Sequence, residues 1–382
     1  MVRAPLEAAP LVCRVAAAAY ERGARLVEAV YSDPQLALAR FAHAPADSFE
    51  EVSQWPVTAG LEYVENGHAL LSIAGIDPDL FKDVDPERLS TVRRAEGRAG
   101  LALSRLISAD AINWCVVAYA TPAWAARVFP NLGPEEAVSR LWSAIFAAVR
   151  LDAPDPTAAW ERHVAALAAR TAMLNERQYT ALRFTGPGTD LTVGLPANHR
   201  WLGGAAPTGI GIDNVANVPT EEVFTAPHRG RVDGVVRATM PLSLSGKLVR
   251  DFSLTFEGGR VVDVQAAEGE ALLRAQIDTD EGSARLGEVA LVPAGSPIAR
   301  SGILYYNTLF DENAASHIAL GRAYRNCIDG CEGLEDEDFA ALGGNSSITH
   351  VDFMIGSAEV DVDGITGDGT AEPLMRAGEW VD

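Results

Sequence analysis

The sequence is poor in the features that mark nucleic-acid-binding, secreted and membrane proteins. Its 382 residues include 31 Lys and Arg against 52 Asp and Glu, and the net charge of −21 argues against nucleic acid or an anionic membrane as a partner. Four cysteines are too few for a disulfide framework in a chain this long. The first residues lack a secretory signal, and the longest uncharged run, Ala111–Ala126, is too short to span a membrane. These absences predict a soluble, cytoplasmic protein.

A phosphate-binding loop is also missing. No predicted strand is followed by Gly-x-Gly-x-x-Gly, so a nucleotide-binding α/β protein, which the first half of the chain would otherwise allow, is disfavoured. Apolar residues make up 48% and charged residues 22% of the chain, which is typical of a globular protein. The length allows two domains with substantial cores.

The first half of the chain alternates strand-like and helix-like segments. Strands are predicted over Arg25–Tyr31, His68–Ile76 and Ile112–Tyr119. Asp33 and Thr121 each precede a proline, as a helix N-cap does before a first-turn proline. This order predicts an α/β N-terminal domain with a largely parallel sheet over residues 1–181, which includes a long helix over Asp155–Arg177.

Residues 182–382 have a different sequence pattern, which predicts short strands separated by turns. Strands are predicted over Val232–Thr239, Lys247–Phe256, Arg260–Val264 and Glu288–Val292. The Ala-rich run Asn313–Tyr324 is predicted to be one helix, and Asp361–Gly364 a turn. We therefore predict an α+β, mostly β C-terminal domain that carries the metal site.

The run His350–Gly356, His-Val-Asp-Phe-Met-Ile-Gly, is the most informative stretch for chemistry. It reads as a strand, so His350 and Asp352 share one face while Val351 and Phe353 share the other. An imidazole and a carboxylate on a rigid strand suit a divalent metal, which takes nitrogen and oxygen ligands. Taken alone, such a pair is more often a polar surface face.

Five further positions are candidates to converge on this strand: Glu221, Glu222, Glu288, His317 and Tyr324. Glu288 heads an apolar strand, where a buried carboxylate requires a partner. His317 and Tyr324 lie two turns apart on the predicted helix and would share a face. Each also allows a structural interpretation: an ion pair of Glu288 with Arg285 or Arg300, a surface His317, and a core Tyr324.

Four segments closely resemble the dimetal aminopeptidases of the aminopeptidase T / aminopeptidase S family, the thermophilic metallopeptidases. They are Pro219–His228, Gly287–Pro293, Ser301–Asn313 and His350–Gly356. Asn113–Tyr119 and Gly186–Thr192 also look like the family, so the match runs over nearly the whole chain. The start departs from the family, whose members usually begin some tens of residues earlier.

The resemblance implies a metal-dependent aminopeptidase that releases N-terminal amino acids from peptides with a free N-terminus, and a homodimer. It implies two divalent ions (Zn²⁺, Co²⁺ or Mn²⁺) bound by five side chains: Glu222, Glu288, His317, His350 and Asp352. Tyr324 matches the family's catalytic tyrosine, and a shift by one residue would exchange Glu222 for Glu221. Two such ions would activate a bridging water, Tyr324 would stabilise the oxyanion, and an unligated acid such as Glu221 would pass a proton to the leaving amine.

Two other functions remain open at this stage. A related metal-dependent hydrolase of a non-peptide or modified amide would keep the same ligands and change only its pocket. A binding protein on a decayed enzyme fold is disfavoured, because every ligand type is present. Turnover of an aminoacyl substrate would separate these alternatives from a peptidase.

Overall fold

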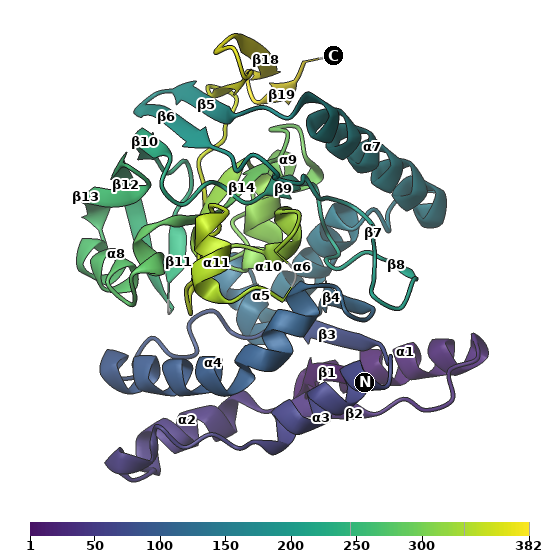
Figure 1. Cartoon of the computed structure of the whole chain (residues 1–382). Helices are drawn as coiled ribbons and strands as arrows, with labels where there is room; N and C mark the ends of the chain where they lie inside the picture. Colours follow the sequence, from purple (N-terminus) through teal and green to yellow (C-terminus); the bar gives the residue numbers. More distant parts are fainter. Residues whose placement is uncertain (245, 332, 382) are drawn as a thin grey trace. The chain divides into compact units, whose positions relative to one another are not determined.

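The computed structural model describes residues 1–244, 246–331 and 333–381 (Figure 1). Its contacts divide the chain into two compact units. Unit 1 comprises Met1–Pro154 with Ala205–Pro219, and unit 2 comprises Asp155–Gly204 with Thr220–Asp382. The long helix α7 (Pro156–Arg177), expected in the N-terminal domain, belongs to unit 2, where Leu167 and Leu174 join the core. The division into domains 1–181 and 182–382 stays a prediction.

Unit 1 contains a four-stranded sheet in the order β2-β1-β3-β4, and every neighbouring pair is parallel. Its strands are β1 (Val2–Pro5), β2 (Ala29–Ser32), β3 (Leu70–Ala74) and β4 (Trp114–Ala118), with a separate hairpin of β7 (Ala206–Pro207) and β8 (Asp213–Asn214). The parallel sheet expected for the N-terminal region is therefore confirmed.

The helices of unit 1 are η1 (Leu6–Ala8), α1 (Ala9–Glu21), α2 (Pro34–His43), η2 (Ala46–Ser48), α3 (Trp55–Glu65), α4 (Pro86–Ser108), α5 (Pro122–Val128) and α6 (Pro134–Ala148). Three of them, α2, α4 and α5, begin at a capping residue that precedes a proline. The Asp33 carboxylate accepts a hydrogen bond from Gln35 N, and the Thr121 hydroxyl accepts one from Trp124 N. Each cap satisfies a backbone N–H that the first helical turn leaves without a partner.

Unit 2 contains a large antiparallel sheet in the order β11-β12-β10-β6-β5-β17-β18-β19, with β13 paired to β12. The strands are β5 (Ala181–Gly186), β6 (Thr189–Gly194), β10 (Val232–Arg237), β11 (Leu242–Leu244), β12 (Lys247–Glu257), β13 (Arg260–Glu268), β17 (Asp361–Ile365), β18 (Ala371–Arg376) and β19 (Glu379–Trp380). The prediction of a turn over Asp361–Gly364 is wrong. This segment lies in β17 and pairs with β5, with Val362 opposite Phe184.

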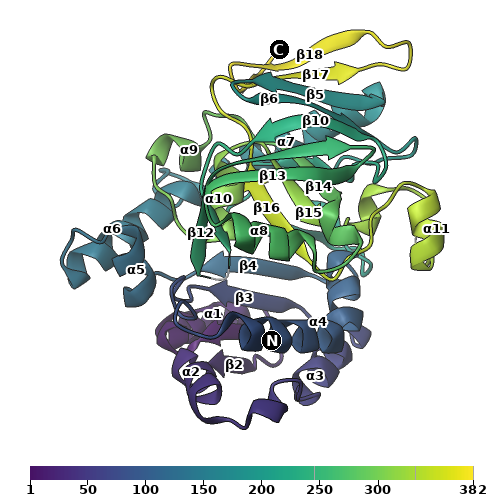
Figure 2. The same ribbon diagram turned by 90° about the vertical axis from the view of Figure 1, so that its left-hand side faces the viewer.

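A second sheet of unit 2 has the order β16-β15-β14-β9 and is also antiparallel; Figure 2 shows β14, β15 and β16 side by side. Its strands are β9 (Val223–Thr225), β14 (Leu286–Leu291), β15 (His317–Gly321) and β16 (His350–Met354). Both sheets contribute to one apolar core, in which the rings of Phe252 and Phe353 lie 5.3 Å apart. The mostly β second half is confirmed.

The other helices of unit 2 are short and connect these strands. They are α8 (Glu270–Ile277), η3 (Gly282–Ala284), α9 (Pro297–Ser301), α10 (Thr308–Asp311), η4 (Glu312–Ala314), η5 (Arg325–Cys327) and α11 (Asp336–Ala341). Among the helices of the described residues, none combines the length and apolar character needed to cross a membrane.

The helix predicted over Asn313–Tyr324 is wrong, because this segment contains the central strand β15. All five residues of His317–Gly321 are buried between β14 and β16. Packing between two neighbouring strands outweighs the helix propensity of the alanines in the run. Tyr324 lies beyond the strand and precedes η5, so helical spacing does not relate it to His317.

Gly321 at the end of β15 gives a first test of this arrangement. Its φ is +108°, and an added Cβ would lie 2.2 Å from Thr349 O on the neighbouring chain segment. We expect Gly321→Ala to lower the free energy of unfolding by about 2–5 kcal/mol, the sum of a left-handed backbone and a steric clash. Gly330→Ala is the matched control, because φ is +84° and, among the described residues beyond its chain neighbours, no atom lies within 4 Å of an added Cβ. Urea unfolding that shows equal losses for both variants would contradict the clash.

Candidate metal centre

The register of three strands aligns acidic and imidazole side chains on one face of the second sheet. Ala319 of β15 pairs with Glu288 of β14 on one side and with Asp352 of β16 on the other. His317 and His350 each lie two residues from this row, so they share its face. The methyl group of Ala319 leaves room between the two carboxylates. Glu222, just before β9, completes the acid–histidine cluster: Glu222, Glu288, His317, His350 and Asp352.

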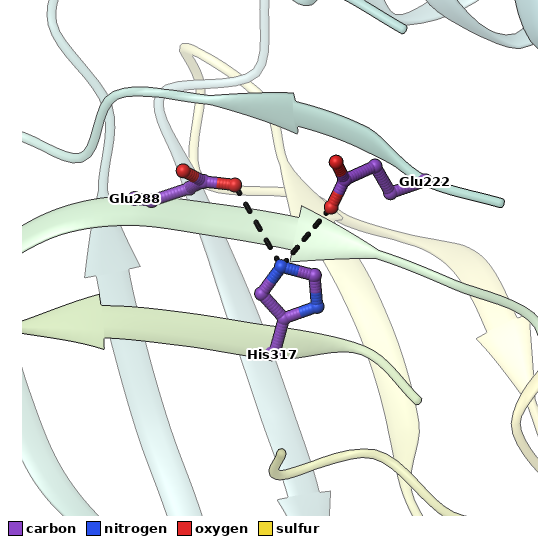
Figure 3. A group of neighbouring side chains, drawn as sticks. All are labelled: Glu222, Glu288 and His317. Atoms are coloured by element: carbon purple, nitrogen blue, oxygen red, sulfur yellow. Dashed lines mark ion pairs between the residues drawn. The ribbon is translucent and has the colours of Figure 1, made fainter. Parts of the chain in front are cut away.

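The side chains of this cluster form two groups that share Glu288. In the first, Glu222 and Glu288 both point at the ring of His317 (Figure 3), whose Nε2 lies 3.1 Å from Glu222 Oε2 and 3.7 Å from Glu288 Oε1. In the second, His350 Nε2 lies 3.4 Å from Glu288 Oε2 and 3.3 Å from Asp352 Oδ1. Within each group the ligand atoms all lie within 4.8 Å of one another.

Both imidazoles are oriented by main-chain carbonyls. His317 Nδ1 lies 3.1 Å from Ala315 O, and His350 Nδ1 lies 2.7 Å from Arg322 O. In the neutral ring, a hydrogen bond from Nδ1–H to a carbonyl fixes the tautomer and leaves the lone pair on Nε2 for a metal ion. In both rings, Nε2 is the atom that faces the carboxylates. The two histidines are therefore presented as ligands in the same way.

The cluster is buried at Glu222, Glu288 and His317 and half-buried at His350 and Asp352, and its titration reflects opposing effects. Burial raises the pKa of Glu222, while its contact with His317 acts in the opposite direction. For His317, burial alone would lower the pKa, but the contacts of its ring with the carboxylates of Glu222 and Glu288 outweigh burial and hold the pKa well above its usual value. Burial likewise opposes ionisation of Asp352, but the charge of His350 prevails and lowers its pKa. The imidazoles thus act as the cations of this site, a role that a metal ion can take over.

The donor set fits divalent cations. Glu222 Oε2 is buried and, among the described residues, receives no hydrogen bond of acceptable geometry. A buried carboxylate oxygen of this kind is costly unless a cation satisfies it. Imidazole nitrogens and carboxylate oxygens without thiolate are the ligands of Zn²⁺, Co²⁺ or Mn²⁺.

Glu221 and Glu222 point to different neighbours. Whereas Glu222 reaches His317, Glu221 Oε2 lies 3.7 Å from Nε2 of His163 on α7. The main-chain N–H of Glu221 donates to Asn313 Oδ1 at 2.6 Å, which fixes the segment that carries both acids. The geometry therefore brings Glu222, and not Glu221, into the acid–histidine cluster.

Tyr324 lies against the cluster through its ring. The ring centroid is 5.1 Å from that of His350 and 5.8 Å from that of Phe224. Burial raises the pKa of Tyr324 well above its usual value, and the charges of Glu288 and Asp352 raise it further. Its hydroxyl therefore stays protonated at neutral pH and is able to donate a hydrogen bond.

Glu312 of η4 is an acid of this site that the sequence interpretation missed. Burial raises its pKa well above the usual value, and the charges of Glu222, Asp352 and Glu288 add to the effect. Glu312 and Asp352 also line the same cavity. It lies within the segment Ser301–Asn313 that carries the family resemblance, but nothing in the local pattern separates it from a surface acid.

Comparison with known proteins agrees with this donor set. The family model described as Thermophilic metalloprotease (M29) matches residues 1–380. This chain belongs to that metalloprotease family. The family resemblance stated from the sequence motifs is thereby confirmed.

The relatives of this metalloprotease are aminopeptidases. Aminopeptidase T of Thermus aquaticus is 50% identical over 378 residues, which are 99% of this chain and 92% of that protein. Aminopeptidase 2 of Geobacillus stearothermophilus is 47% identical over 380 residues, 100% of this chain and 92% of that protein. The solved structure of wild-type AmpT from Thermus thermophilus matches with a TM-score of 0.94 and 48% identity, covering 100% of this chain and 93% of that one.

A more distant structure shares the fold alone. The 2,5-dihydroxypyridine dioxygenase from Pseudomonas putida KT2440 matches with a TM-score of 0.51 and 12% identity, over 100% of this chain and 90% of that one. The assignment of this chain to the metalloproteases therefore depends on its sequence relatives and side chains and not on the fold.

Neutralising Glu312 tests its membership of the site. Because its pKa is raised on folding, its ionised form lowers the stability of the metal-free metalloprotease at pH values above the usual value of 4.5. We expect Glu312→Gln to raise the Tm of metal-free protein at pH 7–8 and to leave it nearly unchanged near pH 4. Added Zn²⁺ should then stabilise the wild type more than the variant.

Glu281→Gln provides a control of opposite sign. The hydrogen bond from Arg285 lowers the pKa of Glu281, so its loss should slightly lower the Tm at neutral pH. Scanning fluorimetry in chelator-treated buffer would follow both variants. An unchanged Tm for Glu312→Gln at pH 8, with an unchanged response to Zn²⁺, would remove Glu312 from the site.

Proposed function

We propose that this chain is a metalloaminopeptidase that releases N-terminal amino acids from peptides through a dinuclear metal centre. The observation that carries the proposal is the pair of three-residue groups that share Glu288. Two groups with one common carboxylate are the arrangement that two neighbouring cations require. The family membership and the aminopeptidase relatives agree with it.

The ligands divide naturally between the two positions. Glu222 and His317 would hold one divalent ion, His350 and Asp352 would hold the other, and Glu288 would bridge them. Glu312 is an added candidate ligand, because it lines the same cavity as Asp352. The absence of thiolate from this set supports Zn²⁺, Co²⁺ or Mn²⁺.

The remaining residues would act on the substrate. When bound, the cations supply Lewis acidity and lower the pKa of a bridging water. Tyr324, protonated at neutral pH, would donate a hydrogen bond to the oxyanion that forms at the scissile carbonyl. Glu221, whose carboxylate lies beside His163 and outside the acid–histidine cluster, would carry the proton to the leaving amine.

The family resemblance carries three further parts of the proposal. It leads us to propose peptides with a free N-terminus as substrates, a homodimer as the assembly and the cytoplasm as the location. Size-exclusion chromatography with light scattering would test the assembly. A mass of one chain would contradict it.

Metal removal and return test the proposed activity. We expect chelator-treated protein to lose hydrolysis of leucine p-nitroanilide and to regain it with Zn²⁺, Co²⁺ or Mn²⁺. His350→Ala should abolish turnover because it removes one ligand of the second group. His228→Ala is a matched control, since His228 is a partly buried histidine of the same unit outside the cluster. Metal binding without turnover of any aminoacyl substrate would point to another amide as the substrate.

Tyr324→Phe tests the oxyanion contact separately from metal binding. Loss of one oxyanion donor typically lowers kcat by about 10²–10³-fold. We expect a loss of this size for Tyr324→Phe with the metal content unchanged, as measured by atomic emission and steady-state kinetics. A variant that keeps its full kcat would exclude Tyr324 from the reaction.

A further inference from the structure

A cavity of about 70 Å³ in unit 2 adjoins the acid–histidine cluster, and the proposed chemistry leaves it without a role. Glu312 and Asp352 line its inner side, so a molecule in the cavity lies next to the candidate metal ligands. The other walls come from β11, from the end of β16 and from the loop before α10. This placement makes the cavity a candidate for a part of the substrate.

The strand that carries two candidate ligands also forms part of the cavity. His350, Asp352 and Met354 are alternate residues of β16, and their side chains therefore point to one face. Met354 also pairs with His317 across the sheet. Met354 thus lies one step of about 7 Å along the strand from Asp352, beside the proposed centre.

Two buried apolar side chains form the floor of the cavity. Leu242 of β11 and Met354 are only 6% and 4% exposed, and each lines the cavity. Leu242 is also part of the main core of unit 2. A floor of Leu and Met favours an uncharged side chain and adapts to its shape.

The rim of the cavity is held in a costly backbone conformation. Tyr306 has φ of +54°, in the left-handed region that a bulky residue avoids at a cost of about 1–3 kcal/mol. Its neighbours are fixed by one carboxylate: Asp311 Oδ1 accepts from Tyr305 N at 2.7 Å and Oδ2 accepts from Asn307 N at 2.9 Å. Both oxygens of Asp311 thereby accept hydrogen bonds from the main chain and hold the rim in this conformation.

We propose that this cavity is the subsite for the side chain of the substrate's N-terminal residue, an inference that rests on the proposed aminopeptidase function. An enzyme that removes one residue at a time needs a dead end for that residue and an open path for the remaining peptide. The buried side chains of Leu242 and Met354 would provide the dead end. A space of 70 Å³ holds roughly five waters, which corresponds to a side chain of about four to six non-hydrogen atoms such as Leu or Met.

Widening the floor should change the preference for the first residue. We compare kcat/KM for alanine, leucine and phenylalanine p-nitroanilides, which share one leaving group, in metal-loaded protein. For Met354→Ala, and independently for Leu242→Ala, we expect the ratio of phenylalanine to leucine turnover to rise about tenfold. Metal content should equal that of the wild type.

Two equally buried residues provide matched controls. Met375 is 1% exposed and Leu244 is 8% exposed, both lie in the same core, and neither lines the cavity. Met375→Ala and Leu244→Ala should lower the Tm to a similar extent and leave the ratio of phenylalanine to leucine turnover unchanged.

Failure of the subsite and failure of the function give different results. Active floor variants whose ratios match the wild type would overturn the subsite. A changed preference for the second residue of dipeptides, with the preference for the first unaffected, would assign the cavity to the leaving part of the substrate and also overturn the proposed subsite.

If the wild type hydrolyses no anilide with any metal, the proposed function fails, and calorimetric binding of L-leucine and L-alanine decides the subsite. Loss of a preference for leucine in Met354→Ala would support it, and an unchanged preference would reject it.

Discussion

The antiparallel register of β14, β15 and β16 is the constraint on which the site depends. It places Glu288, Ala319 and Asp352 in one row, with both histidines on the same face. Because the side-chain period of a strand is two residues, a slip by one position would turn the ligands into the apolar core. Asn345 helps to fix this register. Its Nδ2 donates to Gly282 O at 2.8 Å and to Gly321 O at 2.6 Å, at the end of β15. The buried amide thus supports the site without touching it.

Such a cluster opposes folding, and the surrounding core has to compensate for it. Without a cation, the carboxyl groups of Glu222 and Glu312 have raised pKa values because burial disfavours their ionised forms. The same strands bury Val289, Ile318 and Phe353 on their other face, where the two sheets of unit 2 share a core. The opposite faces of three strands therefore have opposite roles, one stabilising and one functional. Metal binding removes part of the cost, so stability and metal affinity are linked.

The sequence predicted the parts of this site that depend on local periodicity. Alternation along β16 was enough to place His350 and Asp352 together, and Glu288 was identified as a buried charge that needs a partner. The prediction failed where long-range packing decides the structure: the segment around His317 has alanines that favour a helix, yet it becomes the central strand β15. Glu312 was missed for a related reason, because only the folded chain brings it beside Asp352. The choice of Glu222 over Glu221 came from the family resemblance, and the geometry supports it.

Strand β16 carries candidate metal ligands beside a residue that lines the adjoining cavity. The likeness to a dioxygenase at 12% identity shows that this fold accepts very different sequences, so the fold by itself does not set the chemistry. On β16, the candidate ligands His350 and Asp352 are followed by Met354, which only shapes the adjoining cavity. A substitution at Met354 changes the volume beside the centre and leaves its donors in place. If the proposed subsite is correct, substrate preference would change by single substitutions on a strand whose register, and with it the candidate metal centre, is preserved.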